Sequence, residues 1–167
     1  MNGKAMSDDS DLVAYLRRSY HAVDGLWFLM AEEAHGFETA LDLDRRVWEV
    51  LAKIQARKAR ELTGCMGNTP QELARCFSLK LTADGHSFEC RIEPGQVRFT
   101  IRECPWLALL EKSERRRIAV QVAQAICPTE GRVWCREFGG EYEYEMPEMQ
   151  CAGDGCCVMR FLRAERA

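Results

Sequence analysis

The apolar residues of this chain change their spacing at Asp84-Gly85, and this change constrains the fold more than any other feature. Before it, apolar residues recur every three or four positions, which is the spacing of one helix face. After it, Phe88, Cys90 and Ile92 alternate with polar residues, which is the period of a strand. The sequence therefore predicts an α+β protein, with mainly helical structure first and strands later.

Two long helices are expected in the N-terminal part. Ser10 can cap the first helix, which Gly36 ends, and the second runs from about Thr39 to Leu62 with Gly64 as its stop. Each helix carries an apolar stripe that should face a core, so we expect a helical hairpin. The stripe residues are Leu12, Tyr15, Leu16, Tyr20, Val23, Trp27 and Met30 in the first helix and Leu43, Val47, Leu51 and Ile54 in the second.

Local start and turn signals place the next elements. Thr69-Pro70-Gln71-Glu72 predicts a helix start, because it combines a capping threonine, a proline at the first helical position and an acid that completes a capping box. A β-hairpin follows, with Glu93-Pro94-Gly95-Gln96 suited to a type II turn. Ser113 can cap a further helix that Cys127-Pro128 breaks, after which Thr129 caps a short helix.

Two strands are expected to close the fold. In the last of them, alternation places Cys157, Met159 and Phe161 on the inward face. The expected architecture is an antiparallel sheet of about four strands, covered on one face by helices, with the N-terminal helical hairpin packed alongside. We expect a single domain over residues 1–167, with 1–9 disordered, 10–83 mainly helical, and 84–167 holding the hairpin, further helices and cysteine-rich closing strands.

The charges of the chain nearly cancel. A net charge of -3 on 167 residues gives no global field that favours nucleic acid or an anionic membrane. No apolar run approaches the ~20 residues that a membrane span needs, and the stretch from Met1 to Ser10 lacks the apolar centre of a signal peptide. The cytoplasm is therefore the expected location, and neither nucleic acid nor a membrane is an expected partner.

Nine cysteines are the outstanding compositional feature. An odd number of thiols in a cytoplasmic chain does not suit a disulfide framework, so metal binding, redox chemistry or burial must account for them. Cys76 and Cys90 fall on apolar faces, where burial explains them. Five others lie at the ends of predicted elements, where metal ligands can converge: Cys104, Cys127, Cys151, Cys156 and Cys157.

Four of these cysteines are the candidate ligands of one metal ion. We expect Cys104, Cys127, Cys151 and Cys157 to bind it, with Cys156 as the alternative to Cys157. Zinc is the expected ion and iron the alternative, because four thiolates satisfy zinc tetrahedrally. Strand alternation supports Cys157, since it shares the inward face of the last strand. Plain burial and redox chemistry of the same thiols are the competing interpretations.

The segment 151–161, CAGDGCCVMRF, resembles the closing motif of the bacteriochlorophyll 4-vinyl reductase-type domain. In that motif a cysteine, a Gly-Asp turn and a second cysteine lead into the last strand. With the segments 24–28 and 102–106, DGLWF and RECPW, the chain is also similar to a broader set that includes 2-amino-thiazoline-4-carboxylate hydrolase-like proteins. The resemblance covers about residues 12–161.

This resemblance implies an α+β fold and cysteines that bind a ligand or a metal. Cys151, Asp154 and Cys157 match the motif, whereas Cys156 is additional. Neither hydrolase activity nor tetrapyrrole chemistry transfers on the fold alone.

Acidic and aromatic residues suggest where a ligand pocket could lie. Asp24 is followed by a glycine and by an apolar run that must be buried, and Glu33 lies further along the same helix. Two tryptophans lie within two residues of a cysteine and could wall off a metal site or a pocket. A solvated helix face and ordinary core packing are the alternatives. The candidate pocket residues are Asp24, Trp27, Glu33, Trp106 and Trp134.

Three classes of function fit these features. The first is a metal-binding module that binds or senses a small molecule. The second is a small hydrolase that opens the C–N bond of a heterocyclic or amide substrate, although only His21, His35 and His86 could act as its base. The third is a redox switch formed by Cys156 and Cys157. The shortage of histidines favours the first class, with a small-molecule ligand or substrate as partner and a homodimer as a further candidate.

Overall fold

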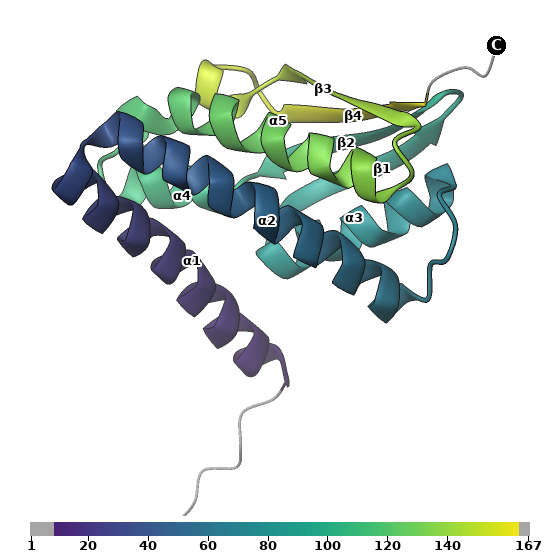
Figure 1. Cartoon of the computed structure of the whole chain (residues 1–167), viewed down its shortest axis with the longest axis horizontal. Helices are drawn as coiled ribbons and strands as arrows, with labels where there is room; N and C mark the ends of the chain where they lie inside the picture. Colours follow the sequence, from purple (N-terminus) through teal and green to yellow (C-terminus); the bar gives the residue numbers. More distant parts are fainter. Residues whose placement is uncertain (1–8, 164–167) are drawn as a thin grey trace, which may run out of the picture. The chain divides into compact units, whose positions relative to one another are not determined.

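The structure of the chain is a computed structural model, and it describes residues 9–163 (Figure 1). The segment predicted to be disordered, 1–9, lies outside the described residues except for its last position, which begins the first helix. In chain order the elements are α1 (Asp9–His35), α2 (Phe37–Thr63), α3 (Pro70–Asp84), β1 (Ser87–Glu93), β2 (Gln96–Glu103), α4 (Pro105–Lys112), η1 (Arg116–Ile118), α5 (Ala119–Glu137), β3 (Tyr142–Glu148), η2 (Gln150–Ala152) and β4 (Cys157–Arg163).

The chain divides into two compact units. The first, Met1–Ala40, holds α1 and the beginning of α2, and the second, Leu41–Ala167, holds the other elements. In the part of the chain that the structure describes, no helix is both long enough and apolar enough to cross a membrane.

The four strands of the second unit form one antiparallel sheet in the order β1-β2-β4-β3. Helix α3 packs against β1 and β2, and α5 packs against β3 (Figure 1). Aromatic rings fill the space between helices and sheet, with the Phe77 ring 4.9 Å from the rings of Phe99, Trp134 and Phe161. The predicted α+β fold, with N-terminal helices and an antiparallel sheet of four strands, is confirmed.

Most of the predicted helix ends are correct. Gly36 separates α1 from α2 with a positive φ of 84°, and Thr69 caps α3 with its side-chain oxygen. The carboxylate of Glu72 completes the capping box by accepting the backbone N–H of Thr69 at 3.1 Å. The N–H of Gly67 has the largest effect and, together with the hydroxyl and N–H of Thr69 and the N–H of Met66, lowers the pKa of Glu72 to about 2. Ser10, predicted as the first cap, lies inside α1 instead.

The inward face of α2 differs from the prediction. Val47 and Ile54, predicted to face the core, are 45% and 58% exposed. Residues spaced three or four positions apart are buried in their place. Three of them are alanines, which let a helix approach its neighbours closely where a larger residue would hold it away. The buried residues of α2 in the second unit are Asp44, Trp48, Ala52, Ala56 and Ala59.

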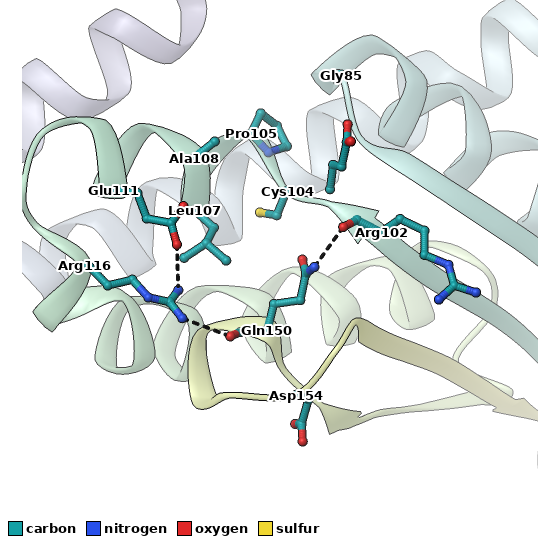
Figure 2. A pocket seen from close by; sticks show the side chains of 11 residues that line it. Gly85, Arg102, Cys104, Pro105, Leu107, Ala108, Glu111, Arg116, Gln150 and Asp154 are labelled. Carbon is teal, nitrogen blue, oxygen red and sulfur yellow. Dashed lines mark hydrogen bonds and ion pairs between the residues drawn. The ribbon is translucent and has the colours of Figure 1, made fainter.

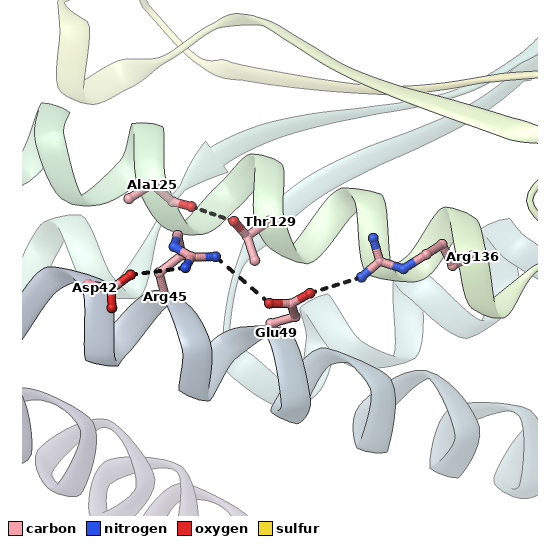
Figure 3. A network of polar contacts seen from close by, with 6 residues as sticks. All are labelled: Asp42, Arg45, Glu49, Ala125, Thr129 and Arg136. Carbon is pink, nitrogen blue, oxygen red and sulfur yellow. Dashed lines mark hydrogen bonds and ion pairs between the residues drawn. The ribbon is translucent and has the colours of Figure 1, made fainter.

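The predicted helix break at Cys127-Pro128 is wrong, because α5 runs without interruption from Ala119 to Glu137. Proline removes one helical N–H, but the packing of α5 on β3 holds the helix together. Thr129, predicted as a cap, lies inside the helix and donates its hydroxyl to the carbonyl of Ala125 at 2.8 Å (Figure 3). Ser113 ends α4, a helix that the sequence interpretation missed, rather than beginning a new one.

Ion pairs join α5 to α2 on the surface of the second unit. Glu49 of α2 lies 3.4 Å from Arg136 of α5 and 3.8 Å from Arg45 (Figure 3). Further along α2, Arg57 pairs with Glu137 at 2.8 Å. Exposed pairs of this kind each contribute little stability, so the alignment of the two helices depends mainly on apolar packing.

A close approach of α5 to β3 leads to a first testable prediction. Gly131 of α5 lies under the ring of Tyr144, and a Cβ at this position would overlap the ring. Alanine normally stabilises a helix relative to glycine by about 1 kcal/mol. Here the overlap with the ring should outweigh that gain, so Gly131→Ala should lower the free energy of unfolding by roughly 1 to 3 kcal/mol, as measured in urea.

Gly25→Ala is the matched control for this prediction. Gly25 also lies inside a helix, but apart from its chain neighbours and the backbone of its own helix nothing lies within 4 Å of the position that its Cβ would take. The change should be neutral or stabilising by up to about 1 kcal/mol. An increase in stability in Gly131→Ala as well would show that α5 and β3 are less tightly packed than the structure describes.

Candidate functional site

The four cysteines predicted as metal ligands all lie in the second unit. Cys104 follows β2 and precedes the first residue of α4, and Cys127 lies within α5 rather than at a helix end. Cys151 belongs to η2, and Cys157 is the first residue of β4. Four different segments of the chain therefore supply them.

The thiols of these four cysteines act on one another electrostatically, which indicates that they lie in one region of the second unit. Burial is the largest cause that raises the pKa of each of the four. In addition, Cys104 and Cys157 raise the pKa of Cys127, and Cys151 raises the pKa of both Cys104 and Cys157. We call Cys104, Cys127, Cys151 and Cys157 the thiol cluster.

Cys156 and Cys157 point to different surroundings. Cys157 is buried, as strand alternation predicted, and its sulfur accepts the backbone N–H of Gln150 at 3.3 Å. The thiol of Cys156 instead donates to the Glu148 carboxylate at 3.4 Å. Cys156 also raises the pKa of Cys157, but its own thiol is bonded to Glu148, so we do not include it in the thiol cluster.

The thiol cluster has the donor atoms that zinc prefers, but its side chains do not converge closely enough to hold a metal ion. Four cysteine sulfurs are a common zinc ligand set. Within residues 9–163, however, no three His, Cys, Asp or Glu side chains converge closely enough to hold a metal ion. The metal site therefore stays a prediction.

A buried group of three charges lies next to the thiol cluster. Lys80 Nζ is 3.0 Å from Asp84 and 2.6 Å from Glu130, and all three side chains are at most 7% exposed. Burial acts to lower the pKa of Lys80, but the two carboxylates together raise it above its ordinary value. Burial also raises the pKa of Glu130, and the Lys80 cation opposes that increase. We call these three residues the charged triad.

The charged triad and the thiol cluster act on each other electrostatically. The Lys80 cation lowers the pKa of Cys104 and Cys127 against the larger effect of burial, and Glu130 raises the pKa of Cys127. The sequence interpretation missed this triad. The sequence does contain an indication of it. Lys80 lies one residue before Leu81 and three after Phe77, on the apolar face of α3, and lysine is rarely buried there without a charged partner.

A pocket of about 470 Å³ opens beside Cys104 (Figure 2). Its walls come from the end of β2, from α4, from the start of η1 and from the loop around η2. Figure 2 shows the Cys104 sulfur pointing between Leu107 and the amide of Gln150. Arg116 bridges the two sides, 3.4 Å from Glu111 and 3.2 Å from the carbonyl oxygen of Gln150.

The predicted pocket residues are divided between the two units. Asp24, Trp27 and Glu33 lie in the first unit, where Trp27 is 42% exposed and Glu33 is exposed. Trp106 lies in α4, with its ring 5.4 Å from the Trp48 ring. Trp134 is fully buried in the core. None of the five lines the pocket beside Cys104.

The chain is an α+β protein with a pocket whose wall includes the thiol of Cys104. Residues 5–132 match the model of DUF6125, a family of unknown function. Because this match covers well over half of the chain, the protein belongs to that family. The match ends before the segment 151–161, so it does not include the cysteine motif that resembles the 4-vinyl reductase-type domain. No curated protein and no solved structure matches the chain.

Proposed function

We propose that this protein is a metal-binding module for a small molecule, in which the thiol cluster takes one zinc ion and the neighbouring pocket takes the ligand. The observation that carries the proposal is that four cysteines from four segments act on one another electrostatically, and that one of them, Cys104, lines a pocket. Iron is the alternative ion, since it also accepts four thiolates.

The pocket and the thiol cluster share residues, which would couple ligand binding to metal binding. Cys104 belongs to both. Gln150 lines the pocket, donates its backbone N–H to Cys157 and donates its side-chain amide to the carbonyl of Arg102 at 2.8 Å. A ligand that moves Gln150 would therefore also move a metal ligand. The polar lining favours a polar small molecule over an apolar one.

The closing motif is a further argument for the same proposal. Cys151 and Cys157 flank the Gly-Asp turn that resembles the 4-vinyl reductase-type domain, and Asp154 accepts the backbone N–H of Met149 at 2.8 Å. That hydrogen bond closes the loop that carries the first cysteine. The loop is therefore shaped to present Cys151, which agrees with a ligand role.

A small C–N hydrolase is the second candidate function, and one observation favours it. Cys104 lies on the pocket wall at the N-terminus of α4, where the backbone N–H groups of Leu107 and Trp106 lower the pKa of its thiol. Burial has the larger, opposite effect on that pKa. A hydrolase would show turnover that is lost in Cys104→Ser and in protein alkylated at Cys104, whether or not metal is bound.

Metal content is the second testable prediction. Protein purified under reducing conditions without added metal should carry about one zinc or iron per chain, measured by elemental analysis. A chelator that removes the ion should lower the melting temperature, because metal binding contributes to folding. Cys90→Ser, a change outside the thiol cluster, should leave the metal content unchanged. Metal-free protein with nine titratable thiols after unfolding would refute the proposal.

A further inference from the structure

Cys65 and Cys76 lie next to one another in the core of the second unit, outside the thiol cluster. Cys65 belongs to the loop 64–69 that joins α2 to α3, and Cys76 lies within α3 (Figure 1). Both side chains belong to one buried apolar cluster, with exposed fractions of 5% and 0%, and both thiols are free. Burial accounts for each cysteine singly, but two thiols in contact can also react with one another.

The loop 64–69 lies along α3 and holds Cys65 against it. On one side of Cys65 in the chain, the hydroxyl of Thr63 lies 3.2 Å from the sulfur of Cys76. On the other side, the two backbone N–H groups that follow Cys65 donate to the carboxylate of Glu72 at 3.1 and 2.7 Å. Glu72 and Cys76 are one helical turn apart on α3. The buried side chain of Cys65, between these two contacts, therefore lies beside Cys76.

The two thiols act on each other directly. Burial has the largest effect on the pKa of Cys76, and the Thr63 hydroxyl opposes it. A side-chain hydrogen bond with Cys65 and the charge of that residue add to the effect of burial, and the pKa of Cys76 rises to about 11. Cys76 is therefore almost fully protonated at neutral pH. Because the thiolate is the form of cysteine that reacts, Cys65 is the member of the pair that an oxidant attacks first.

We propose that Cys65 and Cys76 are a reversible oxidation site, at which hydrogen peroxide converts the two thiols into a disulfide that joins the loop 64–69 to α3. The loop is already fixed to α3 by hydrogen bonds, so the bridge would form between parts that the fold holds in place. Adjacent cysteines such as Cys156 and Cys157 could close only a strained ring. This inference does not depend on the thiol cluster or on a bound metal.

The reaction proceeds in two steps. The Cys65 thiolate attacks one oxygen of the peroxide, the O–O bond breaks, and hydroxide leaves and takes up a proton to form water, so that Cys65 becomes a sulfenic acid. The Cys76 sulfur then attacks the Cys65 sulfur, the S–O bond breaks, and a second water leaves with the proton of Cys76. Two thiols have then lost two electrons and two protons to one peroxide. The contact between the sulfurs makes the second step intramolecular, which compensates for the small thiolate fraction of Cys76.

Peptide mapping of folded, full-length protein treated with hydrogen peroxide at neutral pH tests the site. Trypsin cleaves after Arg75, between the two cysteines, so a disulfide would join peptides 61–75 and 76–80. The joined peptide should have the sum of their masses less two hydrogens, and dithiothreitol should separate it. Cys135 is the internal control, because it is as buried as Cys65 and burial raises the pKa of its thiol to about 12. It should remain a free thiol.

Alanine variants separate the two steps. In Cys76→Ala the sulfenic acid of Cys65 has no thiol to react with, so dimedone should label Cys65 after peroxide treatment. In Cys65→Ala the thiol of Cys76 should stay free. Cys135→Ala should form the joined peptide as the wild type does. Circular dichroism checks that each variant is folded, and the map of the wild type decides the question even where a variant is not.

The melting temperature measures whether the bridge fits the folded protein. Peroxide should raise the melting temperature of the wild type by about 5 °C more than that of Cys65→Ala, because the bridge restricts the unfolded chain. A lower value than in Cys65→Ala would mean that the disulfide distorts the fold, and would overturn the proposal. So would free thiols at Cys65 and Cys76 after treatment of the wild type, or a sulfinic acid on Cys65 beside a free Cys76.

Discussion

Cys157→Ser should lower the metal content of the protein to a small fraction of one ion per chain and destabilise the fold by several kcal/mol, on the order of 3 kcal/mol. The loss of one thiolate leaves an open position in a four-ligand site and an incompletely neutralised cation. Cys157 is also buried at the start of β4, so serine would place a polar hydroxyl in a buried position. Elemental analysis and urea unfolding measure the two effects separately.

Cys156→Ser is the matched control, since it changes the adjacent residue in the same way. Its thiol faces Glu148, outside the thiol cluster, so both metal content and stability should stay near those of the wild type. Equal effects in the two variants would contradict the assignment. The reverse order would mean that Cys156, not Cys157, completes the site with Cys151.

Lys80→Met should destabilise the fold by about 3 to 5 kcal/mol, the usual cost of removing one partner from a buried ion pair. Methionine keeps the volume of the side chain but leaves Asp84 and Glu130 buried without their cation. Lys58→Met is the control, because Lys58 lies the same 2.6 Å from Glu61 on the exposed surface. That change should cost no more than about 1 kcal/mol.

The pH dependence of Lys80→Met separates charge from packing. Burial already raises the pKa of Glu130 in the folded protein, and removal of the Lys80 cation should raise it further. A carboxyl whose folded pKa exceeds its unfolded pKa loses stability as the pH rises between those two values. The defect of Lys80→Met should therefore be smaller in mildly acidic buffer than above neutral pH. An unchanged defect would indicate lost packing alone.

The helix ends and strands could be predicted because local chemistry sets them. Thr69 and Glu72 form a capping box from residues three apart, and the alternation that ends at Ile101 follows one strand. The continuation of α5 through Pro128 could not be predicted in this way, because the contacts of α5 with β3 outweigh the local tendency of proline to end a helix. The buried face of α2 could not be predicted either, because it depends on how closely Ala52 and Ala56 let α2 approach its neighbours in the packed fold.

The candidate site was predicted in part for the same reasons. Cysteines at predicted element ends pointed to the thiol cluster, although Cys127 turned out to lie within a helix. The charged triad was missed because Glu130 is 50 residues from Lys80 in the sequence, and only the packed fold makes them neighbours.

The strand order also bears on how the protein folds during synthesis. Among the four strands β4 is made last, yet it lies between β2 and β3, pairing with both. Until the ribosome has released it, the β1-β2 hairpin has an open edge, β3 has no partner, and Phe161 is missing from the rings around Phe77. The sheet can therefore close only after β4 has been made, and the long-range contacts that closure needs slow it and leave strand edges exposed to aggregation meanwhile.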